Sequence, residues 1–160
     1  MGVRVKGRSR TSKTYVSNDV LFTPPEIFEL LAIEFDLDVC APTGGLDWIP
    51  AKKSIDETED GLATEWKGKV WMNPPYSNVT PWIDKWLKHK NGFCLVPFSA
   101  AKWSVKLWDS EATGVLMDQT TIKFITPDLT RQAIFMPVGL WAIGETNITA
   151  LKDSGIGKLR

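Results

Sequence analysis

Cysteine and histidine are scarce in this sequence, whose 160 residues contain two cysteines and one histidine. Both cysteines, Cys40 and Cys94, fall in apolar stretches that we expect to be buried strands. A structural zinc site needs four ligands, which two cysteines and one histidine cannot supply by themselves. His89 lies in a basic run at residues 88–90, and no Ser-His or Cys-His pair is evident. We therefore expect no metal ion, no covalent nucleophile and a reduced, cytoplasmic compartment.

Three further features are missing: a long apolar run, a secretory leader and a dinucleotide-binding fingerprint. No apolar stretch approaches the roughly 18 residues that a membrane-spanning helix needs. The basic start at residues 1–5 has no apolar segment behind it, so we do not expect a signal peptide. Gly-x-Gly-x-x-Gly does not occur, which argues against a nicotinamide-dependent enzyme. We expect no membrane association and a single globular domain at residues 19–160.

The formal net charge is zero, but the charges are unevenly distributed. The first thirteen residues contain no acidic side chain and five basic ones, which are Arg4, Lys6, Arg8, Arg10 and Lys13. Residues 54–66 show the reverse, with five acidic side chains and no basic one. We expect residues 1–18 to form a flexible basic arm, because they show no apolar periodicity. Such an arm is compatible with phosphate contacts to a nucleic acid and, on charge alone, equally with a solvated terminus.

Hydrophobic periodicity predicts an α/β domain. The first helix is expected to begin with Thr23 as its cap, Pro24 at its first position and Glu26 completing a capping box, and to extend its apolar face to Phe35. The pattern also predicts strands at 37–41, 70–72, 93–96, 115–117, 122–125, 133–136 and 138–143, helices at 81–87 (capped by Thr80) and 100–109, and irregular chain at 46–68. Helix and strand alternate at first and the chain ends in a hairpin, which predicts a mostly parallel sheet with an antiparallel edge hairpin.

Tryptophan is abundant, with eight residues. Most of them, including Trp71, Trp82, Trp86 and Trp141, fall at positions that face the predicted core, so packing is their expected role. Trp48 and Trp66 lie in predicted loops.

The chain is organised around one stretch, in which the strand at 70–72 runs into Asn73, Pro74, Pro75 and Tyr76. Two consecutive prolines have fixed φ angles and no N–H donors, so neither a helix nor a central strand continues through them. The resulting turn is stiff and places Asn73 and Tyr76 at the end of the strand, where open α/β sheets bind their ligands. A proline-stiffened β-turn without function is the simpler interpretation. The apolar strand before the turn and the tyrosine within it favour a functional site.

The tetrapeptide resembles the catalytic motif of S-adenosylmethionine-dependent amino-group methyltransferases, which methylate adenine N6 or cytosine N4 in DNA. The surrounding chain is similar to the small phage-type DNA N-6-adenine methyltransferases. Three more pieces carry this resemblance: Thr-Pro-x-x-x-Phe at 23–28, Leu-Asp-Val-Cys-Ala at 37–41, and Asp-Gly-Leu at 60–62 ahead of Trp66. The resemblance, over about residues 20–140, implies a compact Rossmann-like methyltransferase domain, S-adenosyl-L-methionine as cofactor and double-stranded DNA as substrate.

The resemblance also implies roles for individual residues. It makes Asn73, Pro74, Pro75 and Tyr76 the catalytic motif. It implies a cofactor site made of Thr23 and Pro24 beside the methionine moiety, Asp38, Cys40 and Ala41 at the methionine end, Asp60, Gly61 and Leu62 at the adenine, and Asn73. The Pro-Thr-Gly-Gly loop at 42–45 departs from the family's usual sequence. Trp48 and Trp66 are further candidates to flank the cofactor's adenine ring.

The chemistry of the motif follows from the amine it acts on. The exocyclic amine of adenine is a poor nucleophile, because its lone pair is delocalised into the ring. The Asn73 side-chain carbonyl and the Pro74 main-chain carbonyl would accept hydrogen bonds from its protons, while Tyr76 would stack on a base extruded from the duplex. Positioning and preorganised dipoles would then provide the rate. The sequence leaves open cytosine N4, RNA adenine or protein glutamine as the target, and also a catalytically silent DNA-binding module.

Overall fold

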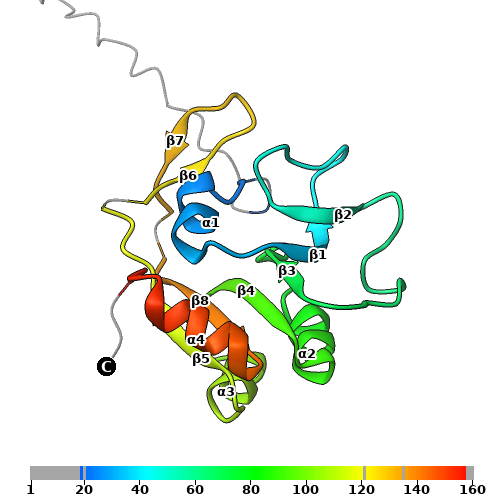
Figure 1. Cartoon of the computed structure of the whole chain (residues 1–160), viewed down its shortest axis with the longest axis vertical. Helices are drawn as coiled ribbons and strands as arrows, with labels where there is room; N and C mark the ends of the chain where they lie inside the picture. Colours follow the sequence, from blue (N-terminus) through cyan, green and yellow to red (C-terminus); the bar gives the residue numbers. More distant parts are fainter. Residues whose placement is uncertain (1–18, 20, 121, 135, 158–160) are drawn as a thin grey trace, which may run out of the picture.

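The computed structural model describes residues 19, 21–120, 122–134 and 136–157, and these form a mixed α/β fold (Figure 1). In chain order the elements are α1 (Pro25–Leu31), β1 (Phe35–Ala41), β2 (Ala51–Asp56), β3 (Val70–Met72), α2 (Thr80–His89), β4 (Gly92–Pro97), α3 (Lys102–Trp108), β5 (Thr113–Leu116), β6 (Phe124–Ile125), β7 (Arg131–Gln132), β8 (Val138–Ile143) and α4 (Glu145–Asp153). Within the described residues, no helix has the length and apolar character needed to cross a membrane.

A six-stranded sheet in the order β2-β1-β3-β4-β8-β5 forms the centre of the fold. Strand β1 pairs in parallel with β2 and β3, and β3 pairs in parallel with β4. Strand β8 runs antiparallel between β4 and the edge strand β5. This confirms the predicted mostly parallel sheet with an antiparallel edge. The hairpin β6–β7 is a separate two-stranded sheet.

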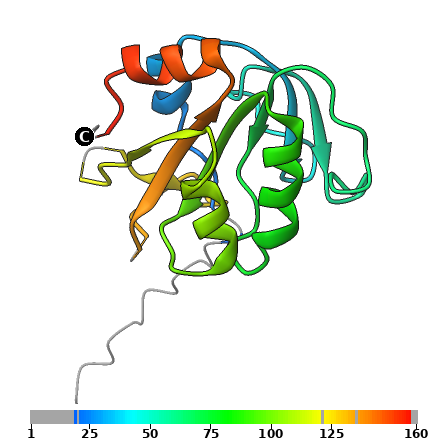
Figure 2. The same ribbon diagram turned by 90° about the horizontal axis from the view of Figure 1, so that it is seen from below.

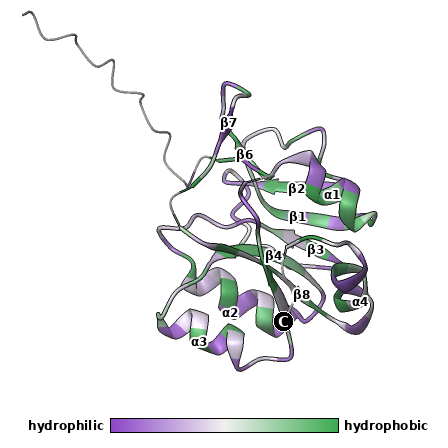
Figure 3. Ribbon diagram, turned by 90° about the vertical axis from the view of Figure 1, so that its left-hand side faces the viewer, coloured by the Kyte–Doolittle hydropathy of each residue, from purple (hydrophilic) through white to green (hydrophobic). Residues whose placement is uncertain are grey.

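Helices cover both faces of the sheet, as Figure 2 shows. Helices α1 and α4 share one hydrophobic core with Phe35, Trp71 and Phe93, whereas α2 and α3 pack over the other core. In the first core the Trp71 ring meets Phe28 edge-on at 4.7 Å between ring centroids. Helices α2, α3 and α4 are coloured in both green and purple in Figure 3, as expected for helices that bury one face only.

Two elements were not predicted, and both carry weak patterns. Strand β2 lies in the region that was expected to be irregular. Its residues show no clear alternation, because Lys52 and Lys53 are both exposed and Ile55 is its one fully buried residue. Helix α4 follows Gly144, and its buried residues are Asn147 and Leu151. A helix that buries an asparagine beside a single leucine has little hydrophobic periodicity to reveal it.

The start of α1 corrects the predicted capping. Pro24 occupies the N-cap position, no side chain caps the helix, and Phe35 opens β1 instead of closing the helix face. Glu26 forms no capping box, since its carboxylate accepts two hydrogen bonds from Arg131 at 3.0 and 2.8 Å. These bonds lower the pKa of Glu26 and join α1 to the hairpin β6–β7.

Two smaller predictions are also wrong. Helix α2 already includes Thr80, and its N-cap is Val79, which provides no side-chain hydrogen bond. The strand expected at 133–136 is replaced by β7 at Arg131–Gln132, which pairs with β6.

The carboxyl ends of the parallel strands define the edge at which a site is expected. Strands β1, β2, β3 and β4 run in one direction, so their carboxyl ends meet at the same edge of the sheet. Pro42 follows β1, Glu57 follows β2 and Asn73 follows β3. Residues that follow three different strands, among them the polar Glu57 and Asn73, are thereby brought to a single edge.

Candidate active site

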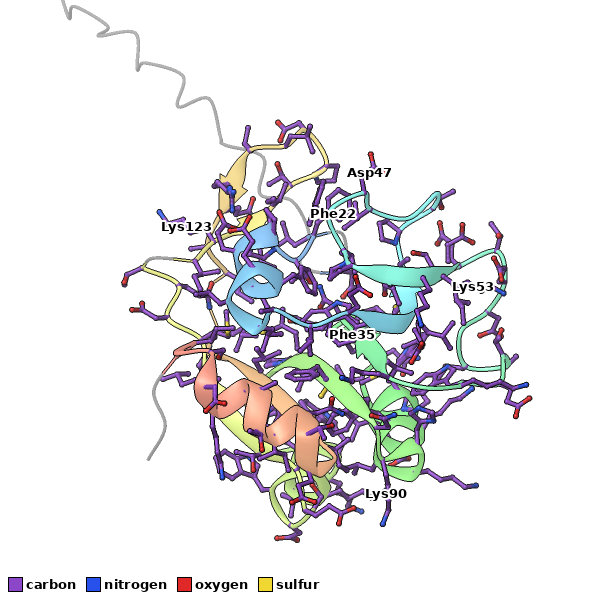
Figure 4. The ribbon with its side chains drawn as sticks, viewed as in Figure 1. Phe22, Phe35, Asp47, Lys53, Lys90 and Lys123 are labelled. Carbon is purple, nitrogen blue, oxygen red and sulfur yellow. The ribbon has the colours of Figure 1, made fainter. Side chains whose placement is uncertain are left out.

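A cavity of about 710 Å³ opens at this edge of the sheet. Its walls come from the ends of β1, β2 and β3, the segment before α1, the loop at 60–61, helix α2 and the hairpin loop. The lining residues are Asp19, Leu21, Phe22, Thr23, Asp38, Val39, Cys40, Ala41, Pro42, Thr43, Leu46, Ile49, Ile55, Asp56, Glu57, Asp60, Gly61, Trp71, Asn73, Pro75, Trp82 and Pro127. Figure 4 shows Phe22 on the side of the molecule that carries the hairpin, far from Lys90 at the end of α2.

The charged residues of the cavity are all acidic. Its lining includes the carboxylates of Asp19, Asp38, Asp56, Glu57 and Asp60, and none of its described residues is a lysine, arginine or histidine. Among the described residues, no group of three or more histidine, cysteine or acidic side chains is arranged to hold a metal ion. A cavity of this charge repels phosphate groups and attracts an organic cation.

Asp38 is the most deeply buried of these carboxylates, with 1% of its surface exposed. The Cys40 main-chain N–H donates a hydrogen bond to its Oδ1 at 3.3 Å. Burial raises the pKa of Asp38 from 3.8 to about 7, despite this bond. Burial and the neighbouring Asp38 charge raise the pKa of the Cys40 thiol to about 12, so that it stays neutral. A cationic ligand at Asp38 would restore the favourable environment that its carboxylate lacks.

The ends of β1 and β2 are joined by polar contacts across the cavity rim. The Gly44 N–H donates to Asp56 Oδ2 at 3.2 Å, and the Thr43 hydroxyl donates to Glu57 Oε1 at 3.0 Å. Thr58 also donates to Asp56 through its N–H and hydroxyl, which lowers the pKa of Asp56. Asp56 therefore has a structural role, while Glu57 is exposed at the rim.

Neither Asp56 nor Glu57 was predicted as a site residue, because β2 was expected to be irregular chain. The signal that the sequence offers is slight. It consists of one apolar residue, Ile55, directly before two carboxylates.

The loop that carries Asp60 is held by hydrogen bonds from Lys85 and Trp66. Lys85 Nζ donates to the carbonyl oxygens of Gly61 and Leu62 at 3.2 and 2.8 Å, and Trp66 Nε1 donates to Gly61 O at 2.8 Å. A Cβ atom added at Gly61 would lie 2.1 Å from Val39 O, so only glycine fits there. Asp60 itself is exposed at the cavity, and its Oδ1 accepts a hydrogen bond from Leu62 N at 3.1 Å.

The stiff turn after β3 is fixed at both ends. Asn73 Nδ2 donates to the Thr23 hydroxyl oxygen at 3.0 Å. Beyond the tetrapeptide, Ser77 donates to the Asp19 carboxylate through its N–H at 3.1 Å and its hydroxyl at 2.5 Å. The Tyr76 hydroxyl donates to Leu95 O of β4 at 3.2 Å. Burial raises the pKa of Tyr76, so this hydroxyl stays protonated.

Most of the expected catalytic and cofactor-binding residues meet in this cavity. Those that line it are Thr23, Asp38, Cys40, Ala41, Asp60, Gly61, Asn73 and Pro75, and those that do not are Pro24, Leu62, Pro74 and Tyr76. The Tyr76 ring is half-buried and packs against the cores on both faces of the sheet. The expected nucleic-acid contacts of the arm, Arg4 to Lys13, lie outside the described residues.

The two loop tryptophans do not line the cavity. Trp66 is buried and stacks on Trp82 with 6.5 Å between ring centroids. Trp48 is half-buried, and its indole Nε1 donates to Thr23 O at 2.8 Å. The aromatic residues that line the cavity are Phe22, Trp71 and Trp82, and both tryptophans were expected only to fill the core.

Comparison with known proteins gives these residues a context. The sequence matches the family described as DNA N-6-adenine-methyltransferase (Dam) over residues 9–134. It is also 35% identical over 81 residues to a DNA N-6-adenine-methyltransferase of Haemophilus phage HP1 (strain HP1c1). That alignment covers 48% of this chain and 44% of the phage protein, so less than half of the relative's length is matched. No solved structure matches the chain.

Both matches confirm the resemblance that the four sequence motifs predicted. The family match extends over most of the chain, including the tetrapeptide and all the described parts of the cavity. The chain therefore belongs to the DNA N-6-adenine-methyltransferase (Dam) family.

Proposed function

We propose that this protein transfers a methyl group from S-adenosyl-L-methionine to N6 of adenine in double-stranded DNA, in the cytoplasm of a bacterial host. The family supports the reaction class, and the phage relative supports the setting. One structural observation supports the proposal independently of the family match. Asn73, which begins the catalytic motif, and Asp38, the expected cofactor carboxylate, line the same cavity.

The sheet order supports a Rossmann-like fold for this domain. The chain passes from β1 to its neighbour β2 on one side and then returns to β3 on the other side of β1. Doubly wound sheets bind their ligands at such a reversal of strand order, outside the carboxyl ends of the strands. The cavity lies at this position, between residues that follow β1, β2 and β3.

S-adenosyl-L-methionine fits the residues of the cavity better than a phosphate-bearing cofactor does. The cavity volume of about 710 Å³ is within the roughly 300–1,000 Å³ of small-molecule sites. Its acidic lining favours a ligand of net positive charge, such as one with an ammonium and a sulfonium group beside a single carboxylate, and repels a nucleotide phosphate. When bound, this cofactor supplies a methyl group on a positively charged sulfur.

Three carboxylates are suited to separate parts of the cofactor. The buried Asp38, beside Cys40, would bind the ammonium group, and Thr23 would border the methionine end. Asp60 would accept a hydrogen bond from the adenine amine, with the loop backbone at 61–62 against the ring. Glu57, at the end of the second strand, is placed to accept hydrogen bonds from the ribose hydroxyls, as an acidic residue does in related α/β folds.

The tetrapeptide would act on the target amine through acceptors and shape. Asn73 Oδ1 and the Pro74 carbonyl would accept hydrogen bonds from the two amino protons, and this would direct the nitrogen lone pair towards the methyl group. The half-buried Tyr76 ring would support an extruded base, with its hydroxyl held by Leu95 O. Because β3 and the two prolines hold these groups in place, little reorganisation is needed during the reaction.

A methyl-transfer assay with three substrate classes tests the proposed function. The protein would be incubated with cofactor labelled on the methyl group and, separately, with plasmid DNA, RNA and a protein extract. Label is expected in the DNA and in neither of the others. Label in RNA or protein alone would contradict the choice of substrate, and no transfer to any of them would favour a silent binding module.

Substitutions at Tyr76 test the role of its ring. Tyr76→Phe keeps the aromatic face and loses one hydrogen bond to Leu95 O, so it should retain most activity. Tyr76→Ala should lose most activity, since a stacked base contributes about 1–3 kcal/mol. Turnover and melting temperature would be measured for both variants. If Phe is as damaging as Ala and both proteins stay folded, the hydroxyl matters more than the ring and the stacking role fails.

The basic arm should add nonspecific affinity for DNA. Its five positive charges would contact phosphates, and each contact contributes about 0.9 to the slope of log affinity against log salt. Deleting residues 1–13 should therefore reduce this slope by up to roughly 4–5, while sequence preference is retained. Binding titrations at several salt concentrations measure the slope. An unchanged slope would mean that the arm makes no phosphate contacts.

A further inference from the structure

Thr23 has a buried hydroxyl that the adjacent helix does not use. The residue is 1% exposed and stands next to the N-cap of α1, but that cap is Pro24 and no side chain bonds to the helix end. The Thr23 hydroxyl instead accepts the hydrogen bond from Asn73 Nδ2 at 3.0 Å. The two residues are 50 positions apart in the chain, so this bond is a tertiary contact and not a local turn.

The main chain at Thr23 is itself held from two directions. Trp48 Nε1 donates to Thr23 O at 2.8 Å. The preceding residue, Phe22, exchanges two main-chain hydrogen bonds with Ile125 of the hairpin, at 2.7 and 3.0 Å. The hydroxyl that meets Asn73 is therefore anchored by groups outside the main sheet.

In this structure the Thr23 contact engages the nitrogen end of the Asn73 amide. A carboxamide that turns by 180° exchanges an acceptor for a donor. An amide NH₂ group directed at the target would repel its amino protons, whereas an amide oxygen accepts hydrogen bonds from them. Because Nδ2 is engaged by Thr23, Oδ1 is the end that remains for a substrate.

We propose that Thr23 is a positioning residue, whose hydroxyl holds the Asn73 carboxamide with its oxygen towards the target amine. This inference rests on the proposed function for its chemistry and assigns Thr23 a role beyond contact with the cofactor. The same short segment fixes the other end of the turn, since the Asp19 carboxylate accepts both hydrogen bonds from Ser77. The tetrapeptide is thus held between two contacts from residues 19 and 23.

Turnover in four variants tests the positioning role. Thr23→Val removes the hydroxyl at nearly constant volume and should lower turnover by about 10- to 100-fold, the scale for a misplaced catalytic group. Thr23→Ser keeps the hydroxyl and should restore most of the turnover. In an Asn73→Ala background, Thr23→Val should have no further effect, because there is no amide left to orient.

The pattern of constants separates this role from others. Cofactor affinity, measured by calorimetry, should change far less than turnover in Thr23→Val. Two results would overturn the inference: an equal loss of turnover with and without Asn73, or a loss confined to cofactor affinity. Either would mean that Thr23 acts through the cofactor or the general fold.

A second measurement on the ligand-free protein needs no enzymatic activity, so it distinguishes failure of the inference from failure of the proposed function. The side-chain amide protons of Asn73 would be followed by nuclear magnetic resonance. One of them should exchange slowly with solvent in the parent and in Thr23→Ser, and quickly in Thr23→Val. Equal exchange in all three proteins would contradict the hydrogen bond, and with it the proposal.

Discussion

Replacing Asn73 with alanine should lower methyl-transfer turnover by about 10²-fold or more, the effect of losing one preorganised hydrogen-bond partner. The reason is that Oδ1 would act on the reacting amine, whereas Nδ2 is already engaged by Thr23. Cofactor affinity should change far less, since the carboxylates proposed to bind the cofactor remain. Steady-state kinetics on DNA combined with calorimetry on the cofactor would give both numbers for the same protein.

Asn78→Ala is the matched control for this experiment. Asn78 is exposed on the same turn and does not line the cavity, so its loss should leave turnover near that of the parent. If Asn73→Ala is as active as Asn78→Ala, the tetrapeptide is a structural turn and Asn73 has no catalytic role. If both variants are equally inactive, the turn as a whole has been disturbed and the assignment to Asn73 fails as well.

The second large effect is expected at Asp38. Asp38→Asn keeps the shape of the side chain and removes its charge, which should weaken cofactor binding by about 1–3 kcal/mol. The affinity of the parent should also depend on pH, because burial raises the pKa of Asp38 to about 7. A cationic ligand needs the ionised carboxylate, so affinity should rise as the pH approaches 7 and level off above it. Calorimetry between pH 5.5 and 8.5 should show this rise in the parent and a flat profile in Asp38→Asn.

Stability should follow pH in the opposite sense in the ligand-free protein. Asp38 holds a proton in the folded state up to a pKa of about 7, whereas its ordinary value is 3.8. Its contribution to stability is therefore complete below that ordinary value and is lost as the pH rises to about 7. Melting temperatures of the parent and Asp38→Asn should diverge over this range, with the variant less sensitive. Parallel curves would show that Asp38 ionises normally and that the cavity lacks the buried carboxylate on which this account relies.

The elements that could be predicted from the sequence are those marked by a pattern of neighbouring residues. Strand β3 and its turn were predictable because an apolar run meets two prolines. Strand β8 was predictable because residues 138–143 form a largely apolar run, and all six are buried in the structure. Strand β2 was not predicted because it has two exposed lysines and only one buried isoleucine, which give no recognisable hydrophobic pattern. With β2 missing, Glu57 had no strand end to mark it as a site residue.

The predicted site followed the same rule. Asp38 lies within β1 and Asn73 directly follows β3, and both belong to short sequence motifs that carry the resemblance. The sequence, in contrast, predicts that the Thr23 hydroxyl caps a helix. Its hydrogen bond to Asn73 forms only when α1 packs beside β3. Proline at the actual N-cap position changes the role of the residue before it. Contacts of this kind depend on the three-dimensional arrangement and leave no local pattern.

The identity of the modified base is the sharpest test of the proposed methyl transfer to adenine. Plasmid DNA from cells without their own methyltransferases would be incubated with the purified protein and the cofactor, digested to nucleosides and separated by mass spectrometry. N6-methyladenine should appear with the parent protein and be reduced about 10²-fold with Asn73→Ala. N4-methylcytosine in its place, or unmodified DNA under conditions in which the cofactor binds, would contradict the account.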